Sequence, residues 1–154
     1  MKKTLILVLS VVVTLSICLL TMTACKTTEY IGTYEMVQVA GTITRCTSYN
    51  SYFEPLLTTK KITQSNFNYF CIKIKASGKA IMESQLSDGR MFSSTYNWAY
   101  RDGKLSFYTT DTEKSINYSM QYNDGTLYFP FYINEGSGVS TQIVELNFVL
   151  KKKN

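Results

Sequence analysis

Four cysteines are the residues of this chain that point most directly to chemistry, because the sequence contains no histidine. Without histidine, the chain lacks the commonest general base and the commonest metal ligand of proteins. The acidic residues stand singly, and Asp88, Asp102 and Asp124 each precede a glycine, as turn residues do. The sequence has no glycine-rich phosphate loop and no calcium-loop spacing of acids. We therefore predict a protein that is not an enzyme and that uses neither a metal nor another cofactor.

Cys25 follows a segment whose layout decides what its thiol does. Met1-Lys2-Lys3 is basic, residues 5–20 are nearly all apolar, and the small residue Ala24 directly precedes the cysteine. This order is typical of a secretion signal. The apolar run of about 16 residues is shorter than the ~20 that a membrane-spanning helix needs. An uncleaved membrane anchor and ordinary secretion with cleavage near Ala24 remain as alternatives.

The motif Met22-Thr23-Ala24-Cys25 resembles the lipobox of bacterial lipoproteins, with methionine where that family usually has leucine. The resemblance implies cleavage after Ala24 and a diacylglycerol attached to Cys25 through a thioether. Each buried lipid CH2 contributes roughly 0.8 kcal/mol to membrane binding, so two or three acyl chains form a lasting anchor. We therefore expect residues 1–24 to be a lipoprotein signal peptide. Lipidated Cys25 would hold the protein on the extracytoplasmic face of a cell membrane.

The rest of the chain has the size of one domain. Removal of the leader leaves 130 of the 154 residues and, with Lys2 and Lys3 gone, lowers the formal net charge from +5 to +3. We expect a polar tether over 25–29, one folded domain over 30–151 and a basic tail over 152–154. The mild charge argues against nucleic acid. The expected state is a monomer whose partners are the membrane and either a small apolar ligand or an envelope protein.

Cys46 and Cys71 are the two thiols that remain in the folded domain, since Cys18 leaves with the leader. Outside the cytoplasm, two such thiols can form a disulfide, here closing a loop of about 25 residues and adding ~3 kcal/mol of stability. The sequence leaves two other states open. The thiols can be buried and idle, or one can be reactive, although no histidine is present to activate it.

From residue 69 onward, apolar and polar residues alternate with the period of two that is typical of β-strands. The dipeptides Ser77-Gly78, Asp88-Gly89, Asp102-Gly103 and Asp124-Gly125 mark turns, and we expect the Asp-Gly turns to be type I′. Pro130 suggests an exposed sheet edge or a bulge. With a first strand before this region, the expected strands cover about 30–44, 69–75, 80–85, 92–100, 105–107, 116–122, 127–133 and 143–150.

Residues 45–68 are the least regular part of the domain. Their large apolar side chains are spaced as in a short helix, which Pro55 could begin. We predict a helix over 54–62 that acts as a lid. Its apolar residues are expected to cover the core rather than to form a binding surface, and with their neighbours they are Tyr52, Phe53, Leu56, Leu57 and Ile62.

Eight antiparallel strands joined mostly by tight turns form a meander, and an open meander leaves its two edge strands unpaired. Closure into a barrel pairs the first strand with the last and removes those edges. We therefore predict an all-β fold, an up-and-down antiparallel eight-stranded barrel with a short helix between its first two strands. A two-sheet sandwich is the alternative.

The turns and aromatic residues also carry a family resemblance over residues 30–151. Its motifs are Gly32-Thr33-Tyr34-Glu35-Met36-Val37, Trp98-x-Tyr100-x-Asp102-Gly103-x-Leu105, Asp124-Gly125-x-Leu127 and Phe148-x-x-Lys151. They resemble the small lipocalin-like domains of bacterial lipoproteins. The resemblance implies an eight-stranded barrel with a helix after the first strand, and it implies no established activity. Tyr34 stands where true lipocalins carry a tryptophan.

An eight-stranded barrel is just wide enough either to be filled by its own side chains or to hold one small ligand. Six aromatic residues share the expected inward parity and would line a pocket: Tyr96, Trp98, Tyr100, Phe107, Tyr118 and Phe129. Alternatively, these rings fill the barrel and the protein is a non-catalytic envelope interaction protein with a protein or wall-polymer partner. Its contacts would then include the outward tyrosines Tyr69, Tyr108, Tyr128 and Tyr132.

Overall fold

The computed structural model describes residues 28–101, 103–109 and 116–153. The expected signal peptide, its cleavage site and Cys25 lie outside the described residues, as does Asp102. The chain divides into two compact units, residues 1–31 and 32–154, and every described strand belongs to the second unit. Within the described ranges, no helix is long and apolar enough to cross a bilayer.

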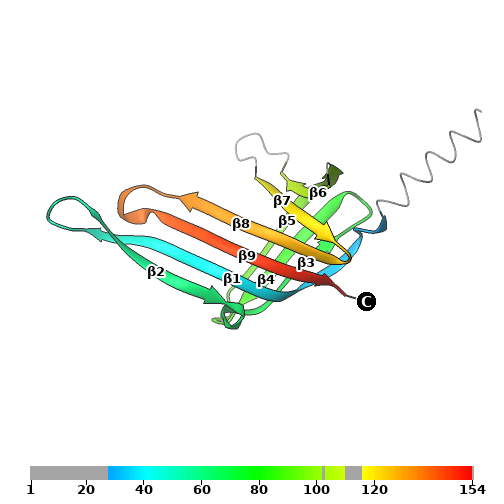
Figure 1. Ribbon diagram of the computed structural model, residues 1–154, viewed down its shortest axis with the longest axis horizontal. Coiled ribbons are helices and arrows are strands. Elements are labelled where there is room, and N and C mark those ends of the chain that lie inside the picture. Colours follow the sequence, from blue (N-terminus) through cyan, green and yellow to red (C-terminus); the bar gives the residue numbers. More distant parts are fainter. Residues whose placement is uncertain (1–27, 102, 110–115, 154) are drawn as a thin grey trace, which may run out of the picture. The chain divides into compact units, whose positions relative to one another are not determined.

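The second unit contains nine antiparallel strands over its described residues (Figure 1). They are β1 (Gly32–Tyr49), β2 (Pro55–Thr63), β3 (Phe67–Ile74), β4 (Lys79–Leu86), β5 (Met91–Arg101), β6 (Lys104–Tyr108), β7 (Asn117–Asn123), β8 (Thr126–Glu135) and β9 (Gln142–Lys152). Two single-turn 3-10 helices complete the described part of this unit, η1 (Gln64–Asn66) and η2 (Gly138–Ser140).

Eight of these strands close into a barrel. Their order is β1-β3-β4-β5-β6-β7-β8-β9, and β9 returns to β1 along a register that runs from Tyr34 opposite Lys152 to Arg45 opposite Gln142. Each strand from β3 onward pairs with the next one in sequence, as in an up-and-down barrel. The predicted barrel is therefore confirmed, and the β1–β9 pairing rules out the open sandwich.

The helix predicted over residues 54–62 is wrong, because this segment is strand β2. It pairs with the second half of β1, from Ala40 opposite Thr63 to Tyr49 opposite Pro55. Two causes favour the strand: its β-branched residues prefer an extended backbone, and β1 offers it an unpaired edge. In barrel order, the single-turn η1 is the only helical segment between the first two barrel strands, β1 and β3.

Strand β1 has two partners along one of its edges. Residues Gly32–Glu35 pair with β3, whereas residues 40–49 pair with β2. As a result, β2 and the adjoining parts of β1, β9 and β8 continue past the other barrel strands as a four-stranded sheet (Figure 1). We call this sheet the extension. It comprises β2, residues 40–49 of β1, residues 130–135 of β8 and residues 142–147 of β9.

A bulge in β1 changes which side chains face the core. The register with β9 shifts between Met36 and Gln38. Strict alternation would place Tyr34 and Val39 on opposite faces, yet both are buried, at 0% and 4% exposure, while Val37 is 42% exposed. The extra residue of a bulge reverses the parity of the positions after it. Alternation alone therefore gives the wrong faces for this strand after residue 36.

The barrel core is aromatic and centred on Phe129, which is 1% exposed. Its ring centroid lies 5.4 Å from that of Tyr118, 5.8 Å from Phe148 and 6.4 Å from Phe70. Phe70 and Phe148 also stack on each other at 4.4 Å. These rings come from β3, β7, β8 and β9, so they join both halves of the barrel.

The turn predictions hold in part. Asp124 and Gly125 have φ values of 44° and 72°, as the predicted type I′ turn requires. At the β4–β5 turn only Gly89 has positive φ, so type I′ is wrong there. The Asp88 carboxylate instead accepts a hydrogen bond from the backbone N–H of Arg90, which stabilises a different turn. Pro130 lies on the part of β8 that pairs with β9 alone, which confirms the predicted exposed edge.

Candidate functional site

An apolar cavity of about 440 Å³ lies where the barrel meets the extension. Its volume exceeds the ~300 Å³ at the lower end of small-molecule pockets. We call it the inner cavity. Its apolar lining comes from β1, β3, β4, β5, β7, β8 and β9, and consists of Ile43, Phe67, Phe70, Met82, Leu86, Phe92, Tyr96, Tyr118, Phe129, Phe131, Ile133, Val144, Leu146 and Phe148.

The structure brings three of the six predicted aromatic residues to this cavity, namely Tyr96, Tyr118 and Phe129. Phe107 is fully buried beside Tyr96, with ring centroids 6.5 Å apart, and fills the core instead. Trp98 donates from Nε1 to the carbonyl oxygen of Lys75 at 2.8 Å, at the β3–β4 turn. Tyr100 is 39% exposed. The alternation of residues correctly predicted which side chains of β5 point into the barrel. Their position along the barrel axis decides which of these side chains reach the cavity.

Several lining residues were missed because sequence reasoning did not place their strands around a common space. Phe70 lies on β3, far in the sequence from the consecutive strands β8 and β9 that carry Phe131 and Phe148. Each belongs to an alternating apolar series, and Phe131 has the parity of Phe129, so the period of two was a usable signal. The alternation could not predict where along the chain β8 and β9 leave the closed barrel.

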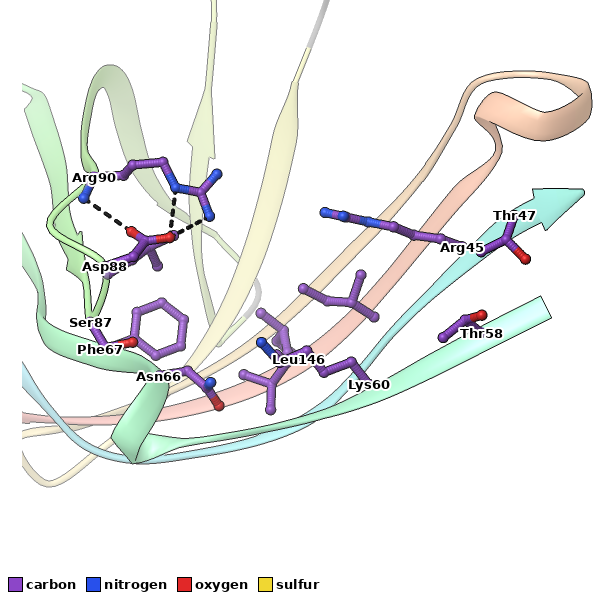
Figure 2. Close-up of a pocket in the computed structure, with 13 residues that line it drawn as sticks. Arg45, Thr47, Thr58, Lys60, Asn66, Phe67, Ser87, Asp88, Arg90 and Leu146 are labelled. Carbon is purple, nitrogen blue, oxygen red and sulfur yellow. Dashed lines mark hydrogen bonds and ion pairs between the residues drawn. The ribbon is translucent and has the colours of Figure 1, made fainter.

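A second hollow of about 450 Å³ adjoins the inner cavity, and we call it the mouth (Figure 2). The two spaces share six lining residues along their common border: Ile43, Arg45, Phe67, Leu86, Arg90 and Leu146. The mouth lies between the concave face of the extension and the β4–β5 turn. Its remaining lining residues are mostly polar, and they are Thr47, Thr58, Lys60, Ile62, Asn66, Ser87 and Asp88.

The charged side chains of the mouth are three cations and one carboxylate. Arg45 extends from β1 into the hollow (Figure 2). Its Nε donates to Oε1 of Gln142 at 3.0 Å. Arg90 donates from Nε to Oδ2 of Asp88 at 2.9 Å, and its Nη2 lies 2.7 Å from the same oxygen. These hydrogen bonds lower the pKa of Asp88. With Lys60, the residues that line the mouth carry a net positive charge.

Tyr118 is the titratable group of the inner cavity with the clearest shift. Burial, reinforced by the neighbouring Tyr96, raises the pKa of its phenol to about 12. The two rings meet edge to face with centroids 5.6 Å apart. Tyr118 therefore stays neutral at physiological pH, and the cavity wall that it forms carries no charge of its own.

The structure does not bring Cys46 and Cys71 together, and both thiols are free and buried. Cys71 of β3 lies opposite Glu35 of β1. Cys46 lies much further along β1 than Glu35, on the order of 30 Å away at the rise of an extended chain. A disulfide needs Cα atoms within about 7 Å. Burial and then Glu83 raise the pKa of Cys71, which disfavours its reactive thiolate.

The tip of the β1–β2 hairpin differs from its predicted role as core cover. Tyr52 and Phe53 are 84% and 87% exposed, and Leu57 is 59% exposed. The Asn50 side chain holds the tip: its Oδ1 accepts from the backbone N–H groups of Tyr52 and Glu54, both at 2.9 Å. We call residues 49–57 the hairpin tip. Of the apolar residues assigned to the core here, only Ile62, outside the tip, is buried, while Leu56 is also exposed.

The outward tyrosines do not form one patch by strand position. Tyr69 lies on β3, Tyr108 on β6, and Tyr128 and Tyr132 on β8, with other strands between them. No group of three Cys, Asp or Glu residues in the described ranges is arranged to bind a metal ion. Comparison of the chain with protein-family models, curated proteins and solved structures finds no match.

Proposed function

We propose that the protein is a lipid-anchored, extracytoplasmic, non-catalytic binding protein that holds a small apolar ligand in the inner cavity. The proposed anchor rests on the leader and Cys25. The observation that supports binding is the inner cavity itself, a space of about 440 Å³ with an aromatic wall where the closed barrel meets the extension. A space of this size that is lined mostly by apolar side chains favours apolar ligands, which lose contact with water on entry.

The packing of the wall supports binding to a preformed site. Phe129, Phe148 and Phe70 contact one another, so their orientations are set by neighbouring rings rather than by a ligand. A side chain that is already ordered loses little conformational entropy when a ligand binds. The two sides of the cavity also come from different strands of one hydrogen-bonded barrel, which keeps the space open.

Binding of the fluorescent apolar probe N-phenyl-1-naphthylamine tests the ligand site. Ser94 lines the inner cavity and is exposed, so Ser94→Phe should fill the space without burying a clash in the core. We expect it to weaken probe binding by about tenfold. Ser119→Phe, an exposed position on β7 outside this cavity, is the matched control. Equal binding by wild type and both variants would argue against a ligand in the cavity.

Mass spectrometry of protein extracted from its own cells tests the anchor. We expect the mature chain to begin at Cys25 and to carry the mass of a diacylglycerol. A chain that begins at Met1 and has an unmodified thiol at Cys25 would contradict the proposed lipid anchor. Because the measurement concerns the leader alone, its result is independent of probe binding.

The hairpin tip favours a second candidate function, contact with another envelope component. Tyr52 and Phe53 are large aromatic side chains held in water by an ordered turn, and Phe53 has a φ of 61°. Exposed aromatic residues of this kind often mark interaction sites. Crosslinking in cells tests the idea. A partner that is captured by the wild type and lost in Tyr52→Ser/Phe53→Ser would support it, and identical crosslinks would contradict it.

A further inference from the structure

We infer that the inner cavity and the mouth together recognise an anionic amphiphile, with its apolar chain in the inner cavity and its anionic head at Arg45 and Arg90. The inference rests on the proposed function, in that it requires an apolar chain to enter the inner cavity. It adds a chemical class to the ligand: one apolar chain joined to a carboxylate or phosphate.

The common border of the two spaces is the first support. The apolar wall of the inner cavity meets the wall of the mouth at six shared residues, and the cationic side chains of Arg45 and Arg90 are among them. Phe67 and Leu146 carry the apolar lining up to this boundary. A chain that reached outward along this wall would bring its head group between the two guanidinium groups.

Arg45 is oriented for a ligand by a neutral neighbour. The side-chain oxygen of Gln142 accepts a hydrogen bond from Nε of Arg45. No carboxylate of the described residues forms an ion pair with Arg45. In Figure 2 its guanidinium group projects away from β1 across the mouth. Its two terminal nitrogens supply the planar fork of N–H donors that suits carboxylate and phosphate oxygens.

Arg90 completes the arrangement from the opposite wall. Asp88 binds its Nε and Nη2 and so holds the guanidinium group in place, while Nη1 has no partner among the described residues. The Arg90–Asp88 pair is nearly neutral by itself, so Arg45 and Lys60 provide the uncompensated positive charge of the mouth. A cationic ligand would be repelled here, and a neutral ligand would leave these donors unused.

Two sources share this chemistry. A free fatty acid offers a carboxylate, and a single-chain phospholipid offers a phosphate. Both place a negative head beside one acyl chain, and the mouth is open enough to accept either. A guanidinium group binds carboxylate and phosphate oxygens alike, so the experiment includes one probe of each kind.

The test compares chain-matched probes on the folded domain by displacement of N-phenyl-1-naphthylamine at neutral pH. The probes are laurate, 1-lauroyl lysophosphatidylglycerol and the neutral dodecanol. We expect at least one anionic probe to bind about tenfold more tightly than dodecanol, and Arg45→Gln to weaken that probe about fivefold with dodecanol nearly unchanged. The matched control is Arg101→Gln, which removes the same charge from an exposed position that lines neither space.

The outcomes separate this inference from the proposed function. If dodecanol and both anionic probes bind equally, and Arg45→Gln changes none of them, the anionic head is refuted while the apolar site stands. If the anionic preference exists but Arg101→Gln reduces it as much as Arg45→Gln, its assignment to the mouth is refuted. If no probe binds, dodecanol included, the proposed function fails as well. A preference that is selectively lost in Arg45→Gln, and that shrinks as ionic strength rises, supports the inference.

Discussion

Gly41 lies on β1 at the start of the extension, opposite Ile62 of β2 and Leu146 of β9, two residues that line the mouth. A Cβ atom added to Gly41 would lie 1.9 Å from the backbone oxygen of Glu145 and 2.8 Å from the Cα of Leu146. Both are backbone atoms, so neither can rotate away. Because an ordinary carbon contact is about 3.5 Å, Gly41→Ala requires β1 and β9 to move apart locally by roughly 1.5 Å.

Such a shift would break the neighbouring β1–β9 hydrogen bonds, whose N···O distances are normally about 2.9 Å. With two or three bonds lost at about 1 kcal/mol each, we expect Gly41→Ala to lower the free energy of unfolding by about 3 kcal/mol. Probe binding should fall too, because the displaced Leu146 lines both the mouth and the inner cavity.

Urea denaturation followed by circular dichroism measures this loss, with Gly89→Ala as the control. Gly89 also has positive φ, at 89°, but a Cβ there meets nothing within 4 Å, so its cost is the backbone term alone, about 1 kcal/mol. If the two variants unfold at the same urea concentration with unchanged m-values, the close approach of β1 and β9 is not as described and the reasoning is refuted.

The remaining predictions concern the core, pH and the thiols. Phe129→Ala should lower the free energy of unfolding by about 3–5 kcal/mol, since it removes a buried ring with four aromatic neighbours; a loss below about 1 kcal/mol in urea denaturation would contradict this packing. Because the pKa of Tyr118 is raised from 10.0 to about 12, its contribution to stability is complete below pH 10 and declines as pH rises from there through 12. Tyr118→Phe should remove the highest-titrating phenol from an absorbance titration at 295 nm, and an unchanged upper limb would count against this. Cys46 and Cys71 should both react with a thiol reagent after unfolding without reductant and only slowly in the native state; a single disulfide-linked species would contradict their separation.

The strands after residue 69 could be predicted because their signals are local. Alternation of apolar and polar residues reports which face of a strand is buried, and glycine marks positions with positive φ. Tyr96 and Phe129 were placed correctly inside the barrel on this basis alone. Closure also followed from a simple argument, since an open meander of this length would leave two bare edges.

The β1–β2 hairpin could not be predicted in this way. Leu56, Leu57 and Ile62 fit a helical spacing, but the backbone of residues 55–63 finds its hydrogen-bond partners on the unpaired edge of β1. That edge is available only because the pairing of β3 with β1 ends at Glu35, and no local sequence pattern predicts where this pairing ends. Exposure of Tyr52 and Phe53 follows from the same cause, because the hairpin reaches past the core that they were expected to cover.

By itself, the sequence determined an all-β chain with glycine turns and an aromatic interior. Its leader also predicts a lipid anchor at a membrane. Only the tertiary structure decided that a bulge at Val37 turns Val39 inward, that Trp98 and Tyr100 lie away from the cavity, and that Arg45 and Arg90 line one mouth. The physical reason is that a strand's sequence encodes its faces, whereas partner register and position along the barrel depend on segments far away in the chain.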